Sequence, residues 1–225
     1  MLRYLSLIFL LALHPVQRAV FMGQNFTPPS GGGAVYVNSA IGANTGLDTP
    51  SVVTYSCAAT GHLLWDFVYS DAVGITGYSV SSMTINLASQ NKSLFAFAGT
   101  CPDTSSHSYT FTYTCTTCGG HAFSYLVETT GTLDAAGPGS GSTPTSTSLD
   151  ASATATTSSG LCIAFGISNS WTPTPPAGYT LVYDDGESNF FYKNSCYTST
   201  GVVSFSAPLI SAPSAEYPTS IVLVH

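Results

Sequence analysis

The chain has 225 residues, of which 7% are charged and 44% hydrophobic, and its formal net charge is −7. This length suits one large all-β domain or two small ones, and the composition excludes an intrinsically disordered chain, which needs low hydrophobicity and high charge. Four basic residues cannot neutralise a row of phosphates, so we expect neither nucleic acid nor an anionic membrane surface as a partner.

The N-terminus reads MLRYLSLIFLLALHPVQRA and is typical of a secretory signal peptide over residues 1–19. Arg3 supplies the basic start, and Leu5 to Leu13 form an apolar run that is too short to span a bilayer. Cleavage after Ala19 would change the net charge from −7 to −9, but the position of the cleavage site stays open because Gln17 departs from the usual small residue at −3. The mature form is predicted to have no transmembrane span and to be secreted or displayed on a cell or virion surface.

Alternation of polar and apolar residues recurs along the chain, and helical periodicity is nearly absent beyond the leader. We expect an N-terminal arm with the first strand in 20–49. The clearest strand is SYTFTYTC, in which Tyr109, Phe111 and Tyr113 share a buried face and the threonines a wet one. HLLWDFVY and GLCIAFGI alternate in the same way, the second with only small residues on its other face. The other predicted strands are 34–37, 52–58, 80–87, 94–98, 122–128, 179–183, 190–197, 202–205 and 220–224.

About a dozen short strands with regular turn signals predict an all-β, jelly-roll-like antiparallel β-sandwich over residues 50–225. The segment AAGPGSGSTPTSTSLDASATATTSSG, 135–160, complicates this prediction. As a linker it would divide the chain into two domains. Its part STSLDASATATTS alternates well enough to be an exposed strand, however, and each half alone would be a thin sandwich. We therefore favour one domain with a long surface loop near 135–146.

Six cysteines, an even number, stand in a chain that we expect to be exported. Disulfides are therefore expected in place of free thiols. Sequence alone does not choose among the many pairings that six cysteines allow. Our working assignment, the last pair by elimination, is Cys162–Cys196 across neighbouring strands, Cys115–Cys118 locally and Cys57–Cys101.

Several stretches resemble, in order and spacing, an uncharacterised group of secreted β-sandwich proteins: HAFSYLVETTGTLDAAGPGSG, SGLCIAFGISNSWTPTPPAGYTLVY, TGVVSFSAP and SIVLV. Proteins of this group are common in bacterial and environmental sequence sets, and some are parts of surface or phage proteins. In that group a strand similar to ATGHLLWDFVY opens the domain, and a turn similar to TPPAG-aromatic-Thr follows a Thr/Ser-rich run. The resemblance covers residues 50–225 and implies a jelly-roll-like sandwich without a catalytic motif. The cysteines are not part of the pattern.

The stretch TPTPPAGYTLVYDDGESNFFYKN, Thr172 to Asn194, is most simply a turn, a strand, a tight hairpin and a return strand. Proline fixes φ, glycine accepts a positive φ, and Asp-Gly is the strongest short hairpin signal. An alternative interpretation is a ligand site in which aromatic rings stack on sugars. Its candidate residues are Trp171, Tyr179 and Tyr183.

Calcium is an alternative role for the acidic turn itself. Three carboxylates within four residues supply hard oxygen ligands, although DDGES lacks the spacing of an EF-hand loop. The candidate ligands are Asp184, Asp185 and Glu187. We expect no other cofactor.

The segment CTTCGGH places Cys115, Cys118 and His121 at a spacing seen in zinc knuckles, with His107 or Cys101 as a candidate fourth ligand. No second C-x2-C pair is present, and export favours oxidation, so a small disulfide-closed turn is the simpler interpretation.

Hydrolase motifs are missing from the sequence, which contains neither G-x-S-x-G nor H-E-x-x-H. A glycosidase site of paired carboxylates would draw on Glu128, Glu187 and Glu216. Any acidic β protein offers such pairs by chance, so this pattern is not specific. The histidines at 62, 107 and 121 have no identifiable serine or aspartate partner.

The sequence therefore predicts a disulfide-stapled extracellular β-sandwich that is not an enzyme. We expect an adhesion or carbohydrate-contacting module or a surface subunit. The alternative is a self-assembling structural protein of a fibre or virion, and the third option is a secreted glycan-active enzyme. The expected partners are a glycan or further copies of the chain in a homo-oligomer. Low charge and Thr/Ser-rich strands favour assembly, because few charges must lose their water at a packed contact.

Overall fold

A computed structural model describes residues 33–42, 51–70, 73–81, 83–88, 93–117, 122–138, 147–168, 173–186, 188–209 and 218–225. In these ranges the chain forms 15 β-strands and no helix. The predicted signal peptide and most of the predicted N-terminal arm lie outside the described residues.

The strands form four antiparallel sheets, which we call A, B, C and D. Sheet A has the order β1 (Tyr36–Ile41), β8 (Ala122–Thr129), β3 (Leu63–Ser70), β6 (Ser93–Thr100), β5 (Thr84–Ala88). Sheet B has the order β2 (Ser51–Ser56), β7 (Ser106–Thr117), β4 (Val73–Val80). Sheet C has the order β12 (Thr180–Asp184), β13 (Ser188–Tyr197), β11 (Gly160–Ile167), β15 (Thr219–Val224), β9 (Leu133–Pro138). Sheet D pairs β10 (Ser148–Ala155) with β14 (Gly201–Pro208).

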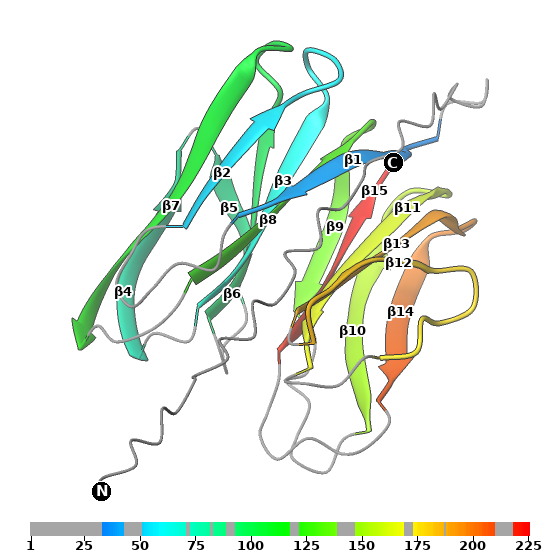
Figure 1. The fold of residues 1–225 in the computed structure, drawn as a ribbon. Coiled ribbons are helices and arrows are strands. Elements are labelled where there is room, and N and C mark those ends of the chain that lie inside the picture. The colour runs from blue at the N-terminus through cyan, green and yellow to red at the C-terminus, as the bar shows by residue number, and fades with distance from the viewer. Residues whose placement is uncertain are drawn as a thin grey trace, which may run out of the picture.

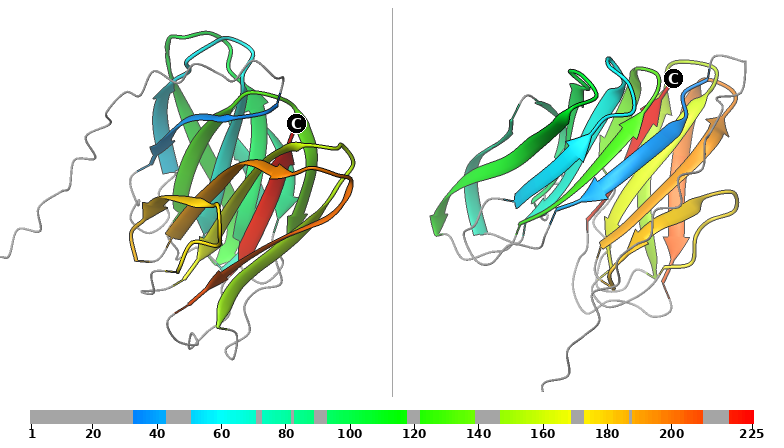
Figure 2. Two further views of the ribbon diagram at one scale, coloured as in Figure 1. Left: turned by 90° about the vertical axis from the view of Figure 1, so that its right-hand side faces the viewer. Right: turned by 45° about the horizontal axis from the view of Figure 1, so that its top comes forward.

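The sheets stack in the order B, A, C, D, so that three hydrophobic cores separate four layers (Figure 1). The central core, between sheets A and C, holds the largest aromatic cluster: Trp65, Phe67, Tyr125, Phe165 and Phe190. Sheets B and D are the two outer layers and lie at opposite ends of the stack, as the further views in Figure 2 show. Sheets A and C are therefore covered on both faces.

Strand β11 shows how the sequence specifies an inner layer, because every one of its residues is buried. Its large residues, among them Ile163 and Phe165, pack into the central core. Its small residues Cys162 and Ala164 face the core between sheets C and D, where the alanines of β10 pack against them. A strand that is apolar on both faces is expected where a sheet is covered on both sides.

Strand β9 occupies residues that the sequence assigns to a long loop, so that prediction was wrong for 135–138. A Cβ at Gly137 would collide with the backbone carbonyl of Ser152 in β10, so the glycine allows sheets C and D to approach closely. Pro138 is tolerated because β9 is an edge strand. Residues 139–146, the rest of the predicted loop, lie outside the described residues.

The predicted fold class is confirmed: the protein is an all-β stack of antiparallel sheets with disulfides. The sheets contain five, three, five and two strands, which does not establish a jelly roll in particular. The pairs Cys57–Cys101 and Cys162–Cys196 are confirmed, whereas the side chains of Cys115 and Cys118 lie outside the described part. The strand predicted over 80–87 was wrong, because Val80 ends β4 and a turn separates it from β5.

The two halves of the chain share one strand order. If β1, β2 and β3 are matched to β9, β10 and β11, and β5 to β8 are matched to β12 to β15, sheets A and C read identically. Sheet B then matches sheet D, with β2 and β7 in the places of β10 and β14. Only β4 has no counterpart among the described strands. This repeat of topology was not predicted from the sequence.

Candidate functional site

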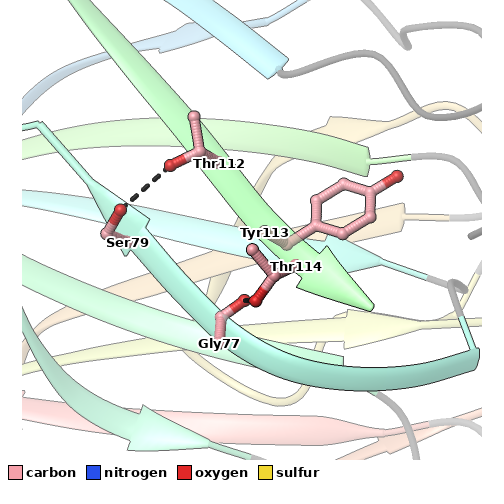
Figure 3. A pocket seen from close by; sticks show the side chains of 5 residues that line it. All are labelled: Gly77, Ser79, Thr112, Tyr113 and Thr114. Atoms are coloured by element: carbon pink, nitrogen blue, oxygen red, sulfur yellow. Dashed lines mark hydrogen bonds between the residues drawn. The ribbon is translucent and has the colours of Figure 1, made fainter. Parts of the chain in front are cut away.

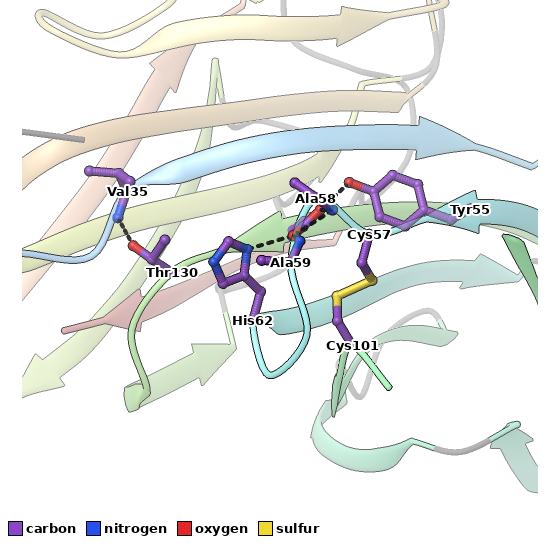
Figure 4. Close-up of polar contacts among 9 residues, drawn as sticks. Val35, Tyr55, Cys57, Ala58, Ala59, His62, Cys101 and Thr130 are labelled. Atoms are coloured by element: carbon purple, nitrogen blue, oxygen red, sulfur yellow. Dashed lines mark hydrogen bonds and ion pairs between the residues drawn. A yellow bond between two sulfur atoms is a disulfide. The ribbon is translucent and has the colours of Figure 1, made fainter. Parts of the chain in front are cut away.

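A polar cluster surrounds Glu128, whose side chain is fully buried near the end of β8. Its carboxylate accepts hydrogen bonds from the Tyr55 hydroxyl at 2.7 Å and from the Ala58 backbone N–H at 2.9 Å. His62 Nδ1 lies 2.6 Å from the same carboxylate. These groups converge from β2 and the turn before β3 (Figure 4). A buried carboxylate with this many donors is well satisfied and holds the turn in place.

The Cys57–Cys101 disulfide lies beside this cluster, and a sulfur of each cysteine and a Glu128 oxygen fall within 4.8 Å of one another. The sulfurs are bonded to each other, so they are not thiolate ligands for a metal. Cys101 is therefore excluded as the fourth ligand of the zinc site considered above. His107 Nε2 lies 2.8 Å from Asp103, and His121 lies outside the described residues.

The prediction that the histidines have no serine or aspartate partner was wrong for His107, whose ring meets Asp103, whereas the ring of His62 meets the glutamate Glu128. The partner of His62 is a glutamate 66 residues away, which only strand pairing brings close. In the described part of the chain, no serine or cysteine nucleophile is hydrogen-bonded to the His62 ring. The pair therefore lacks the third member that a hydrolytic triad requires.

A second carboxylate clamp, on a strand that is not the counterpart of β8, holds the matching turn in the other half. Asp134 of β9 accepts hydrogen bonds from the hydroxyls of Thr156 and Thr157, just after β10, and from Tyr197 Oη at 2.8 Å. Partial burial alone would raise the pKa of Asp134, but these donors outweigh it and hold the pKa well below its usual range. Both halves thus use an acid to fix the turn between their second and third strands.

The predicted aromatic platform is split between two faces of sheet C. Pairing of β12 with β13 shifts register between Leu181 and Tyr183, so a β-bulge breaks the alternation. Tyr183 packs against Phe123 in the central core, with ring centroids 5.8 Å apart. Tyr179 instead meets Phe205 edge-on in the core between sheets C and D. The two rings therefore do not share a face, and Trp171 lies outside the described residues.

The carboxylates of the acidic turn accept hydrogen bonds from within the turn and its flanking strands. Asp184 accepts a hydrogen bond from the Gly186 N–H at 2.8 Å, and Asp185 accepts one from the Ser188 N–H at 2.6 Å and one from the Tyr183 hydroxyl. Gly186 has a φ of +87°, as the hairpin signal predicts. Glu187, the third candidate calcium ligand, lies outside the described residues. The carboxylates therefore serve the turn, and a calcium role for them stays a prediction.

A groove of about 330 Å³ lies beside β14. Its walls come from Tyr179 and Lys193, from the turn Thr198–Thr200 and from the first half of β14. The Lys193 ammonium lies 5.6 Å from the Tyr179 ring centroid and donates to the Ala177 carbonyl. Burial raises the pKa of Tyr179 to about 12, so its hydroxyl is neutral under ordinary conditions. The groove is lined mainly by hydroxyls and backbone.

The outward face of sheet B carries a shallow depression of about 250 Å³ between β4 and β7. Figure 3 shows the side chains that line it, with Ser79 hydrogen-bonded to Thr112 at 2.9 Å and Thr114 donating to the Gly77 carbonyl. The wet face predicted for β7 is confirmed, since Thr112 and Thr114 are exposed while Phe111 is buried. This surface is flat and hydroxyl-rich.

Asp66 is fully buried in β3, on the face that carries Leu64 and Val68. Neither carboxylate oxygen has a hydrogen bond of good geometry among the described residues. Burial raises the pKa of Asp66 to about 7, and the approach of Ser124 and the Tyr125 backbone lowers it only in part. Asp66 is thus a buried acid without access to a substrate, and the sequence analysis did not single it out.

Comparison of the chain with known protein families, with curated proteins and with solved structures finds no match. The resemblance to secreted β-sandwich proteins therefore stays a prediction. In the described ranges, no helix has the length and apolar character needed to cross a membrane.

Proposed function

We propose that the protein is a non-catalytic structural subunit that is exported, oxidised and assembled with copies of itself outside the cell. The observation that carries this proposal is the pair of outward faces at the two ends of the stack. The exposed positions of sheet B carry no charge among the described residues, and all but Val52 are hydroxyls: Val52, Thr54, Ser56, Ser79, Ser106, Ser108, Thr112 and Thr114. The exposed positions of sheet D are similar: Ser152, Thr154, Val202, Ser204 and Ser206.

Such faces favour association because a packed contact between them removes few charges from water. The carboxylate of Asp150 is the single charge at the outward positions of sheet D that the structure describes, and it already accepts a hydrogen bond from Ser148. Two similar faces at opposite ends of one subunit allow head-to-tail contacts, which form rings or filaments.

The use of these two acids supports a non-catalytic role. Glu128 and Asp134 each serve as acceptors for the turn that they fix. The two disulfides support export, because such bonds persist in oxidising compartments.

Glycan contact is the second candidate function, and the groove beside β14 favours it. A half-buried tyrosine next to several hydroxyls and one lysine is a plausible sugar-binding chemistry. The split of Tyr179 from Tyr183 weighs against an extended stacking platform, so we place this function second.

Light scattering of the mature protein, 20–225, over about a hundredfold range of concentration tests the proposal. We expect oligomers whose mass rises with concentration. Thr112→Lys introduces a charge on the outward face of sheet B and should weaken association. Thr60→Lys, at an exposed turn position, is the matched control and should not. A monomer at every concentration refutes the proposal, and retention of that monomer on a glycan array would favour the second candidate.

A further inference from the structure

The repeat of strand order shows that sheet D lacks a counterpart of β4 among the described strands. In sheet B the strand β4 pairs with β7 on the side away from β2. Strand β14 corresponds to β7, but on its side away from β10 the described residues place no strand. The groove of about 330 Å³ lies along this side, bordered by residues 201–204 of β14.

The segment between β11 and β12 stands where β4 stands in the first half, and it does not complete the sheet. Within residues 173–178, the Thr174 N–H donates to the Pro208 carbonyl at the end of β14. Pro173, Pro175 and Pro176 have no N–H, so this segment cannot form a ladder. Among the described residues, the start of β14 therefore keeps a free edge.

The orientation of that edge follows from the same hydrogen bond. The Pro208 carbonyl points away from β10, and β14 pairs with β10 without a register shift. Because backbone groups alternate sides along a strand, the N–H and C=O of Val202, Ser204 and Ser206 also point to the free edge. Val202 is 74% exposed beside it. An edge of this kind is a template for an added strand.

We propose that residues Val20–Thr27 of a second copy of this chain occupy the groove as an extra strand antiparallel to β14. This inference rests on the proposed assembly and adds an exchanged strand to the contacts between its outward faces. The stretch VFMGQNFT is uncharged, lacks proline and has apolar residues suited to a strand. It follows the predicted leader and is joined to β1 by a Pro/Gly/Ser segment, PPSGGG. Apart from residues 1–32, each segment outside the described residues spans at most eight positions between described ones.

The donor is a second copy because of where the chain enters β1. Tyr36 stacks on Tyr192 at 4.3 Å, and its N–H donates to Asn194, on the face of sheet C that packs against sheet A. The groove opens on the opposite face of sheet C, where Tyr179 and Cys196 lie. To reach the groove, the arm of the same molecule would have to pass around the edge of sheet C. The arm of a neighbouring molecule would not.

Three proteins test the inference: the mature form 20–225, the form 28–225, and 28–225 with Ser204→Pro. A labelled peptide of residues 20–27 and its Met22→Pro control are titrated into both shorter forms. We expect 20–225 to associate more strongly than 28–225. The peptide should bind 28–225, and either proline should weaken binding at least about tenfold, since each removes a donor from the new ladder. Hydrogen exchange gives a second measurement on the unsubstituted chain, in which the peptide should protect the amides of β14.

Equal association of 20–225 and 28–225 overturns the inference and leaves the proposed assembly standing. Absence of peptide binding and of β14 protection also overturns it. If 20–225 is monomeric and the peptide still protects β14, the arm fills the groove of its own molecule. That result refutes both the second-copy donor and the proposed assembly.

Discussion

Replacement of Asp66 by asparagine should stabilise the protein, and only at pH values where Asp66 would be ionised. The side chain lies in the core between sheets A and B, without a well-formed hydrogen bond to either oxygen. Asparagine has nearly the same shape but carries no charge, so it avoids the penalty of placing a carboxylate in that core.

The magnitude follows from the pKa, which burial raises from 3.8 to about 7. Because the pKa is raised in the folded state, ionisation opposes folding. The penalty is absent below the unfolded pKa, grows between about pH 4 and 7, and is constant above. Roughly three pKa units at about 1.4 kcal/mol each give about 4 kcal/mol at pH 8, as an upper bound.

Urea unfolding at pH 4 to 8, followed by the fluorescence of buried Trp65, measures this difference. We expect the two proteins to have similar free energies of unfolding at pH 4, and Asp66→Asn to exceed the wild type increasingly up to pH 7. A difference between the two that stays constant over this range would refute the assignment of the pH dependence to Asp66.

Three further predictions use the same assay. Glu128→Gln turns one acceptor into a donor near the Ala58 N–H and should lower the free energy of unfolding by about 2 kcal/mol; an unchanged value would mean that the clamp is not needed. Asp134→Asn should destabilise at pH 7, and its difference from wild type should shrink as the pH falls below about 4, because the pKa of Asp134 is lowered in the folded state. A variant with both Cys57 and Cys101 replaced by alanine should lose up to about 4 kcal/mol, since this disulfide closes a segment of 44 residues. A loss below 1 kcal/mol, with the other disulfide verified by mass spectrometry, would contradict the expected restraint of the unfolded chain.

The fold class was predictable because it follows from the local alternation of polar and apolar residues along each strand. The row Tyr109, Phe111, Tyr113 predicts one buried face, and the structure confirms it. The four-layer stack was not predicted, although GLCIAFGI contains its signal, since neither face of β11 has a residue that needs water. Strand β9 was missed because its Gly137 and Pro138 are ordinary loop signals, and only the close approach of β10 explains them.

The candidate site was less predictable, because its geometry depends on long-range register. His62 and Glu128 meet through the pairing of β3 with β8, which no local pattern contains. The bulge that separates Tyr179 from Tyr183 is likewise invisible in an alternating sequence. A glutamate within the apolar strand AFSYLVET could have indicated a buried acid that needs partners.

The inner position of β11 determines how it can change in evolution. Neighbouring side chains such as Ala164 and Phe165 belong to different cores, so a backbone shift that makes room on one side closes space on the other. A strand of sheet B can accept a new polar residue at every second position, whereas β11 has no permissive site. Substitutions that this protein tolerates should therefore accumulate in its outer layers, and the two middle sheets should vary least.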